Sequence, residues 1–110
     1  MDKYDGVKKF IKSNDSDYVI TDYLGKGSYA IVVQGRNINN DQTVAIKMFI
    51  IDNKNDERNK RLQVLAKREA EILFQLRSHR NIVEIFEYFH SDDSNHSYLI
   101  LELCVNKPTT

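Results

Sequence analysis

The spacing of hydrophobic residues changes period twice along the chain, and this limits the folds that it can adopt. Leucine and isoleucine recur at helical spacing between 56 and 77. Runs rich in β-branched and aromatic residues flank this stretch and read as five strands: 18–24, 30–38, 43–51, 82–90 and 97–104. The order predicts an α+β fold, a five-stranded, mostly antiparallel sheet with one packed helix.

The flanking segments are short and polar. Residues 1–17 are predicted to be a loosely attached N-terminal extension, with a helical turn at 7–11. Residues 105–110 are predicted to be a polar C-terminal end, where Pro108 is not expected to continue a strand. The sequence therefore predicts one small domain, over 18–104, with a single core.

Charge and composition exclude several classes of protein. Lysine and arginine number 16, as do aspartate and glutamate, so nothing in the net charge favours a nucleic-acid or membrane partner. The longest apolar runs are too short to span a bilayer, and residues 1–10 do not form a signal peptide. Cys104 is the only thiol, and the three histidines share no ligand spacing, so we expect no disulfide and no metal site. We expect a cytoplasmic or nuclear location.

Two glycines interrupt a strand-like run in "LGKGSYAIVVQG", residues 24–35. Glycine weakens a strand and leaves a gap in its side-chain surface. Gly25 and Gly27 are therefore explained either by a tight hairpin or by a ligand that approaches the backbone closely. Glycine-rich turns between strands can hold phosphates with backbone N–H groups.

Lys47 lies in the apolar run "VAIK", where it shares one face of the predicted strand with the small Ala45. This pairing leaves room for a flat apolar ligand beside an anion-binding group. The alternative is an edge-strand lysine that points to water. Lysine is seldom buried without a partner, so a buried Lys47 requires an acidic residue close to it.

Glu69 falls within the apolar stripe of the predicted helix, among Leu62, Leu65, Ile72, Leu73 and Leu76. An unpaired carboxylate is costly in such a place, and Lys47 is the obvious cation to face it. The alternative is a surface pair between Glu69 and Lys67 or Arg68. A glycine-rich hairpin, a strand lysine and a helix glutamate together fit the logic of an ATP site.

The order of four motifs resembles the N-terminal, ATP-binding lobe of the eukaryotic protein kinase family over residues 18–104. The motifs are "GKGSYAIV", "VAIK", "REAEIL" and "HRNIVEIF…YLILELC". The resemblance implies ATP as ligand, with the phosphates under the glycine-rich hairpin. It also implies that Leu73 and Ile85 belong to a hydrophobic spine between helix and sheet.

The resemblance assigns roles to individual residues. Lys47 matches the lysine that contacts the α- and β-phosphates, and Glu69 matches its ion-pair partner. Val32 and Ala45 match the residues on either side of adenine, Leu101 the gatekeeper, and Glu102 and Cys104 the hinge. The phosphate-binding hairpin comprises Leu24, Gly25, Lys26, Gly27, Ser28, Tyr29 and Ala30. Ala30 stands where the family usually has a third glycine, which predicts a slightly stiffer hairpin.

Two motifs of the family are not found in these residues. The H-R-D-x-x-x-x-N loop supplies the base, and D-F-G helps to hold Mg²⁺. The "HRN" at 79–81 lacks the aspartate, and the "DDS" at 92–94 is expected to be a turn.

The resulting interpretation is the ATP-binding lobe of a protein kinase, with serine/threonine specificity expected from family frequency. The parent activity is transfer of the γ-phosphate of ATP to a protein hydroxyl, with Mg²⁺ expected only in a complete kinase. The chain alone is expected to be inactive, and neither its protein substrate nor its partner can be named. The alternative is a stand-alone, non-catalytic module that binds nucleotide or protein.

Overall fold

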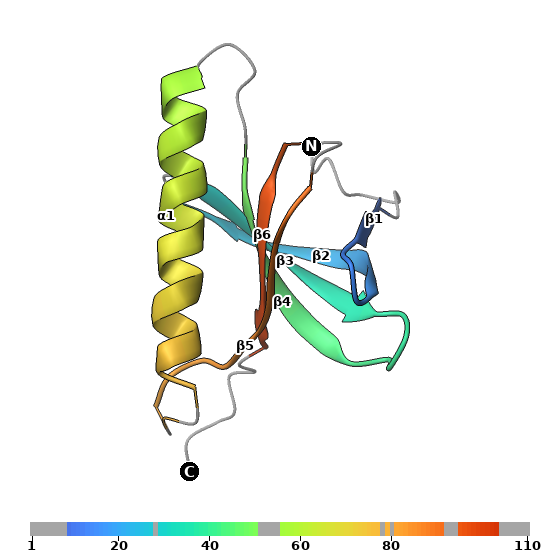
Figure 1. The fold of residues 1–110 in the computed structure, drawn as a ribbon. Helices are drawn as coiled ribbons and strands as arrows, with labels where there is room; N and C mark the ends of the chain where they lie inside the picture. Colours follow the sequence, from blue (N-terminus) through green and yellow to red (C-terminus); the bar gives the residue numbers. More distant parts are fainter. Residues whose placement is uncertain are drawn as a thin grey trace.

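The computed structural model describes residues 9–27, 29–50, 56–77, 79, 81–91 and 95–103. A single long helix lies beside a strongly curled sheet (Figure 1). The elements in chain order are β1 Lys9–Lys12, β2 Asp17–Lys26, β3 Ala30–Asn37, β4 Thr43–Phe49, α1 Asp56–Gln75, β5 Ile85–His90 and β6 Ser97–Glu102.

The sheet has the strand order β1-β2-β3-β4-β6-β5, and every neighbouring pair is antiparallel. This confirms the predicted α+β class. The strand count was wrong, because the described residues form six strands where the sequence predicted five. The β2 strand carries two register shifts, one on each side of the Asp22–Tyr23 pair, so it bends over the strands beside it.

The additional strand is β1, which replaces the helical turn predicted for this segment. Phe10 and Ile11 pair with Val19 and Tyr18 of β2. The alternating order Lys-Phe-Ile-Lys places Ile11 in the core at 5% exposure and Phe10 on the outside. Residues 9–12 are therefore part of the sheet and not a loose extension.

The two faces of the sheet carry separate clusters of buried side chains. Val44, Ile46 and Met48 of β4 belong to the cluster on the face away from α1. Phe49 belongs to the cluster that packs against α1, together with Ile85 and Leu99. Because strand side chains alternate, Ala45 and Lys47 point to the same side as Phe49, toward the helix.

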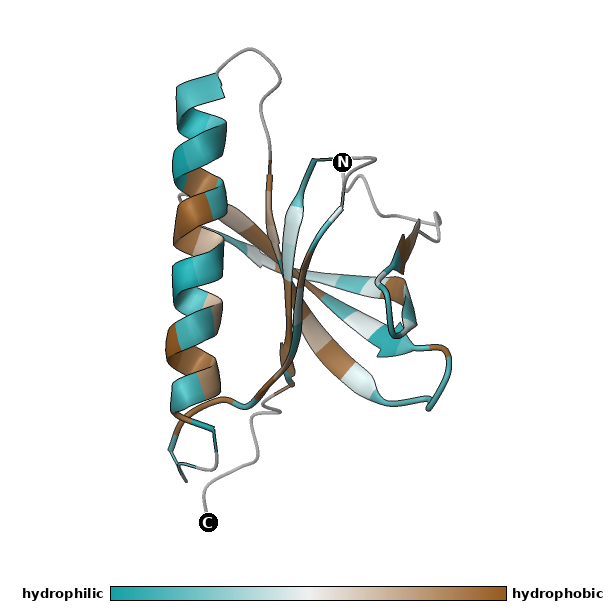
Figure 2. Ribbon diagram, in the orientation of Figure 1, coloured by the Kyte–Doolittle hydropathy of each residue, from teal (hydrophilic) through white to brown (hydrophobic). Residues whose placement is uncertain are grey.

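Helix α1 contacts β4, β5 and β6 through small residues. Leu62, Ala66 and Ala70 are 1%, 0% and 2% exposed and form its buried line. The predicted stripe was partly wrong, because Leu65 and Ile72 are 41% and 50% exposed. Alanine lets the helix approach the sheet closely. The helix therefore turns its alanine side toward the sheet, and the bulkier Leu65 and Ile72 stay partly exposed. Figure 2 shows brown apolar bands along α1 separated by teal polar ones. No helix within the described residues is long and apolar enough to cross a membrane.

A partly buried hydrogen bond links strand β2 to strand β5 at the edge of the sheet. The Tyr18 hydroxyl donates to Glu87 Oε2 over 2.7 Å. Burial, followed by the hydrogen bond and charge of Glu87, raises the pKa of Tyr18 well above its usual range. The folded state thus favours the protonated phenol.

We expect Tyr18→Phe to lower the free energy of unfolding by about 0.5–1.5 kcal/mol at pH 8, because the hydrogen bond to Glu87 is lost. A raised pKa contributes stability that is complete below the unfolded value of about 10 and is lost as pH rises above it. Urea unfolding at pH 8 and pH 10.5 measures both effects. The parent should lose more stability than Tyr18→Phe between these pH values, with exposed Tyr29→Phe behaving like the parent. Equal losses in the parent and Tyr18→Phe would contradict the expectation.

Candidate functional site

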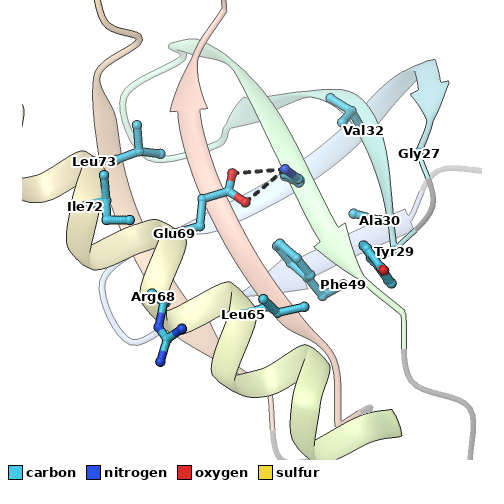
Figure 3. A pocket seen from close by; sticks show the side chains of 11 residues that line it. Gly27, Tyr29, Ala30, Val32, Phe49, Leu65, Arg68, Glu69, Ile72 and Leu73 are labelled. Carbon is cyan, nitrogen blue, oxygen red and sulfur yellow. Dashed lines mark hydrogen bonds and ion pairs between the residues drawn. The ribbon is translucent and has the colours of Figure 1, made fainter.

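A cavity of about 540 Å³ lies between the β2–β3 hairpin, strand β4 and helix α1 (Figure 3). Six residues singled out in the sequence line it: Gly27, Tyr29, Ala30, Val32, Lys47 and Glu69. They come from three separate parts of the chain. The fold therefore brings together the hairpin, the strand lysine and the helix glutamate.

Lys47 and Glu69 form a two-point ion pair at the centre of this cavity (Figure 3). Lys47 Nζ donates to Glu69 Oε1 over 3.0 Å and to Oε2 over 2.9 Å. The alternatives of a lysine in water and of a local Glu69 pair with Lys67 or Arg68 are thus wrong. An ammonium has three N–H donors, so one remains for a further acceptor.

The pair is half-buried, which limits what it does for stability. The side chains of Lys47 and Glu69 are 29% and 37% exposed. Ion pairs accessible to water contribute about 0–1 kcal/mol to folding. Lys47 Nζ also lies 5.4 Å from the centroid of the Phe49 ring, a cation–π distance. The main consequence of these contacts is therefore a fixed position for a positive charge.

Two rows of side chains cross the sheet on the face that bears Lys47. Val32 and Leu99 flank Lys47 in the strand register, and Ala45 pairs with Leu101 in the next row. Ala45 is 8% exposed, and Leu101 packs at the edge of the helix-side cluster. These small and branched residues make an apolar surface that continues from the cation along the sheet.

The first two glycines of the hairpin differ from Gly35 in what surrounds them. A Cβ built on Gly35 would lie 2.5 Å from Ile46 Cδ1 and 3.0 Å from the Val19 carbonyl oxygen, so packing of the sheet requires glycine there. A Cβ on Gly25 would meet nothing within 4 Å, and one on Gly27 only the Ala30 oxygen at 3.8 Å. Internal packing therefore does not explain Gly25 and Gly27.

Several predicted site residues lie outside the cavity itself. Leu24, Lys26 and Glu102 are exposed, and Gly25, Ala45 and Leu101 do not line it. Ser28 and Cys104 lie outside the described residues. The Glu102 N–H donates to the Glu84 carbonyl over 2.8 Å, which leaves the Glu102 carbonyl as the group to consider at this edge.

The predicted site did not include every residue around the cavity. Phe49, Leu65, Arg68 and Ile72 also line it, and Leu73 completes the wall on the helix (Figure 3). The signal for Leu65, Ile72 and Leu73 was their spacing of three or four residues from Glu69, which places them on the same side of the helix. Arg68 directly precedes Glu69, and no spacing rule singled it out as a lining residue. Within the described part of the chain, no three His, Cys, Asp or Glu side chains could together hold a metal ion.

Comparison with curated proteins gives relatives that share most of this chain. Serine/threonine-protein kinase PLK4 of Xenopus laevis is 43% identical over 90 residues, which are 82% of this chain and 9% of the relative. Calcium-dependent protein kinase 5 of Plasmodium berghei is 40% identical over 103 residues, 89% of this chain and 17% of the relative. Cyclin-dependent kinase-like 1 of Caenorhabditis elegans is 35% identical over 104 residues, 94% of this chain and 24% of the relative.

The chain thus spans about a tenth of the length of its PLK4 relatives and up to a quarter of the others. The family description that matches the sequence is the protein kinase domain, over residues 18–109. The sheet, the single helix and their order are those of the N-terminal lobe that the motifs predicted. On this match and these relatives, the chain belongs to the protein kinase family.

Proposed function

We propose that the cavity around Lys47 is the phosphate end of an ATP site. The observation that carries the proposal is the two-point pair with Glu69, which holds one ammonium below a hairpin. Glu69 occupies two of the N–H donors, and the third is free for a phosphate oxygen. Open space above Gly25 and Gly27 supports a close approach of phosphate to backbone N–H groups.

The apolar rows beside Lys47 are assigned to adenine. Val32 and Ala45 would contact the adenine ring. A side chain larger than Ala45 would fill the space that the ring needs. Leu101 closes the inner end of the site, and the carbonyl of Glu102 would accept a hydrogen bond from the adenine amino group. The same proposal includes the remaining ATP contacts that the resemblance implies. The phosphate-binding hairpin contributes Leu24, Lys26, Ser28 and Tyr29, and the hinge contributes Cys104.

The activity of the whole protein is proposed from its relatives. These relatives are named as a serine/threonine-protein kinase, a calcium-dependent protein kinase and a cyclin-dependent kinase-like protein. We therefore infer that the whole protein transfers the γ-phosphate of ATP to a protein hydroxyl. Mg²⁺ would neutralise phosphate charge when bound there. The chain by itself is not expected to transfer phosphate, because its residues include neither an H-R-D nor a D-F-G motif. A stand-alone nucleotide-binding or protein-binding module is the second candidate.

A series of ligands tests the proposed site without any substitution. We expect affinity to rise from adenosine to ADP and ATP by about tenfold or more, because charge-assisted hydrogen bonds contribute about 1.5–3 kcal/mol each. Calorimetric or NMR titration of the chain measures each dissociation constant. Equal affinity for adenosine and ATP would contradict the phosphate role of Lys47. Equal affinity for ATP and inorganic tripolyphosphate would contradict the adenine role of Val32 and Ala45.

An assay of phosphate transfer tests the expected inactivity of the isolated chain. The chain is incubated with Mg²⁺, radiolabelled ATP and a general protein substrate. No transfer above background is expected, whereas a longer polypeptide with the H-R-D and D-F-G motifs should be active. Transfer by the isolated chain that disappears in Lys47→Ala would overturn the expected inactivity.

A further inference from the structure

A second cavity, of about 220 Å³, lies on the other side of the sheet from the proposed ATP site. Its floor includes Val44 and Ile100, which belong to the cluster on the face away from α1. Its lining also includes residues of the β1–β2 turn, the β3–β4 turn and strand β5. A ligand bound there would not contact the Lys47–Glu69 pair.

The charged residues at this cavity are all acidic. Asp15 and Glu87 line it, and no lysine or arginine among the described residues does. Neither carboxylate forms an ion pair with any residue that the structure describes. Glu87 Oε2 accepts the Tyr18 hydroxyl, which leaves Oε1 for another donor. Burial is the main cause of the raised pKa of Tyr18, and the Glu87 carboxylate is the second, because it disfavours another negative charge beside it.

A buried amide, that of Asn37, has no acceptor for its N–H groups among the described residues. Asn37 is 6% exposed, and its Oδ1 accepts the backbone N–H groups of Asn39 and Asn40 over 2.9 and 3.3 Å. Its Nδ2 donates to no acceptor among the described residues. Every fully enclosed side-chain nitrogen among these residues has a hydrogen-bond partner, so Asn37 Nδ2 is not fully enclosed. Asn37 lines the cavity and its Nδ2 is not fully enclosed, so this group is available to donate to the carbonyl of a ligand there.

The floor of the cavity is apolar. The partly buried Phe86 supplies its accessible surface, beside Val44 and Ile100, which are 1% and 0% exposed. Arginine and lysine place their methylene groups on such surfaces while the cationic head meets a charge. A ring beneath the head adds a cation–π contact. A ligand that satisfies all three features has a cationic head, an aliphatic stem and a nearby carbonyl oxygen.

We propose that this cavity binds an arginine or lysine residue of a partner protein. The cationic head lies between Asp15 and Glu87, the stem crosses Phe86, and the main-chain carbonyl of the same residue accepts from Asn37 Nδ2. A peptide residue supplies both the cation and the acceptor. The site is independent of the proposed ATP site, and its occupant belongs to a protein and not to the nucleotide.

NMR titration of the whole chain with N-acetyl-arginine methylamide, and with the lysine equivalent, tests the proposal. Saturable shifts are expected at the Asn37 side-chain amide and at the Glu87 backbone N–H. The citrulline equivalent has the same shape and no charge, and it should bind at least about tenfold more weakly. Equal affinity for citrulline, or no saturable shift with the cationic compounds, overturns the proposal. Tighter binding of free arginine than of the blocked compound would overturn the assignment to a protein partner.

Substitutions distinguish the cavity from general surface charge. Asp15→Asn and Glu87→Gln should each weaken binding several-fold, because each removes one charged contact. Glu71→Gln, an exposed change of equal charge on α1, should leave binding unchanged. Asp15 lies in an exposed turn, so its variant tests the site even if Glu87→Gln disturbs Tyr18. Equal weakening by Asp15→Asn and Glu71→Gln would show non-specific attraction and overturn the proposal.

Discussion

Lys47→Ala is expected to lower the affinity of the chain for ATP by about tenfold or more and to leave its affinity for adenosine nearly unchanged. The ammonium is held by both oxygens of Glu69, at 3.0 and 2.9 Å, and has one N–H left for phosphate. Its removal takes away the phosphate contact and leaves the apolar rows intact. Because the pair is about one-third exposed, the free energy of unfolding should change by less than about 1 kcal/mol.

The matched control is Lys67→Ala, which removes the same charge from an exposed position on α1. It should change ATP affinity less than about twofold, because screened surface charges at a distance contribute little. Glu69→Gln keeps the shape of the side chain but releases the lysine, so it should weaken ATP binding less than Lys47→Ala. The double variant should resemble Lys47→Ala alone, since Glu69 acts through the lysine. Equal losses of ATP affinity in Lys47→Ala and Lys67→Ala would contradict the assigned role.

The Lys47–Glu69 pair was predictable because two simple periodicities determine it. The alternation of β4 puts Lys47 on the same face as Ala45, and the helical period puts Glu69 on the side of α1 nearest the sheet. Lys47 lies in an apolar run and Glu69 in the apolar stripe of the helix, where an unpaired charge is costly, so a pair between the two was the favoured expectation. The pairing follows from local rules, and the structure contains it at hydrogen-bond distance.

Other features depend on contacts that no local rule contains. The four residues of β1 form a strand only because β2 offers a free edge, and "KFIK" in isolation is compatible with a helical turn. The rotation of α1 depends on Ala66 and Ala70, whose small size matters only when a sheet lies against them. Leu65 and Ile72 were predicted to be buried because periodicity measures apolarity and not the depth of packing.

Leu62→Ala is expected to lower the free energy of unfolding by about 2–5 kcal/mol, the largest effect on stability that we predict. Leu62 is 1% exposed, and it is the one large side chain on the fully buried line of α1, where its neighbours are Ala66 and Ala70. Two alanines cannot move to fill the cavity that its removal leaves. Domains of this size have a total stability of about 5–15 kcal/mol, so the loss is a large fraction.

Urea unfolding followed by circular dichroism measures this change, with Val64→Ala as the control on the same helix. Val64 is 54% exposed, and alanine has the higher helix propensity, so the control should be neutral or slightly stabilising.

Leu62→Ala should also weaken ATP binding at temperatures where it remains folded. Looser packing of α1 moves Glu69 relative to Lys47, and the lysine then has no fixed position. A Leu62→Ala chain that unfolds like Val64→Ala would show that α1 is not held by this line. A destabilised Leu62→Ala chain with unchanged ATP affinity would show that Lys47 does not depend on the helix.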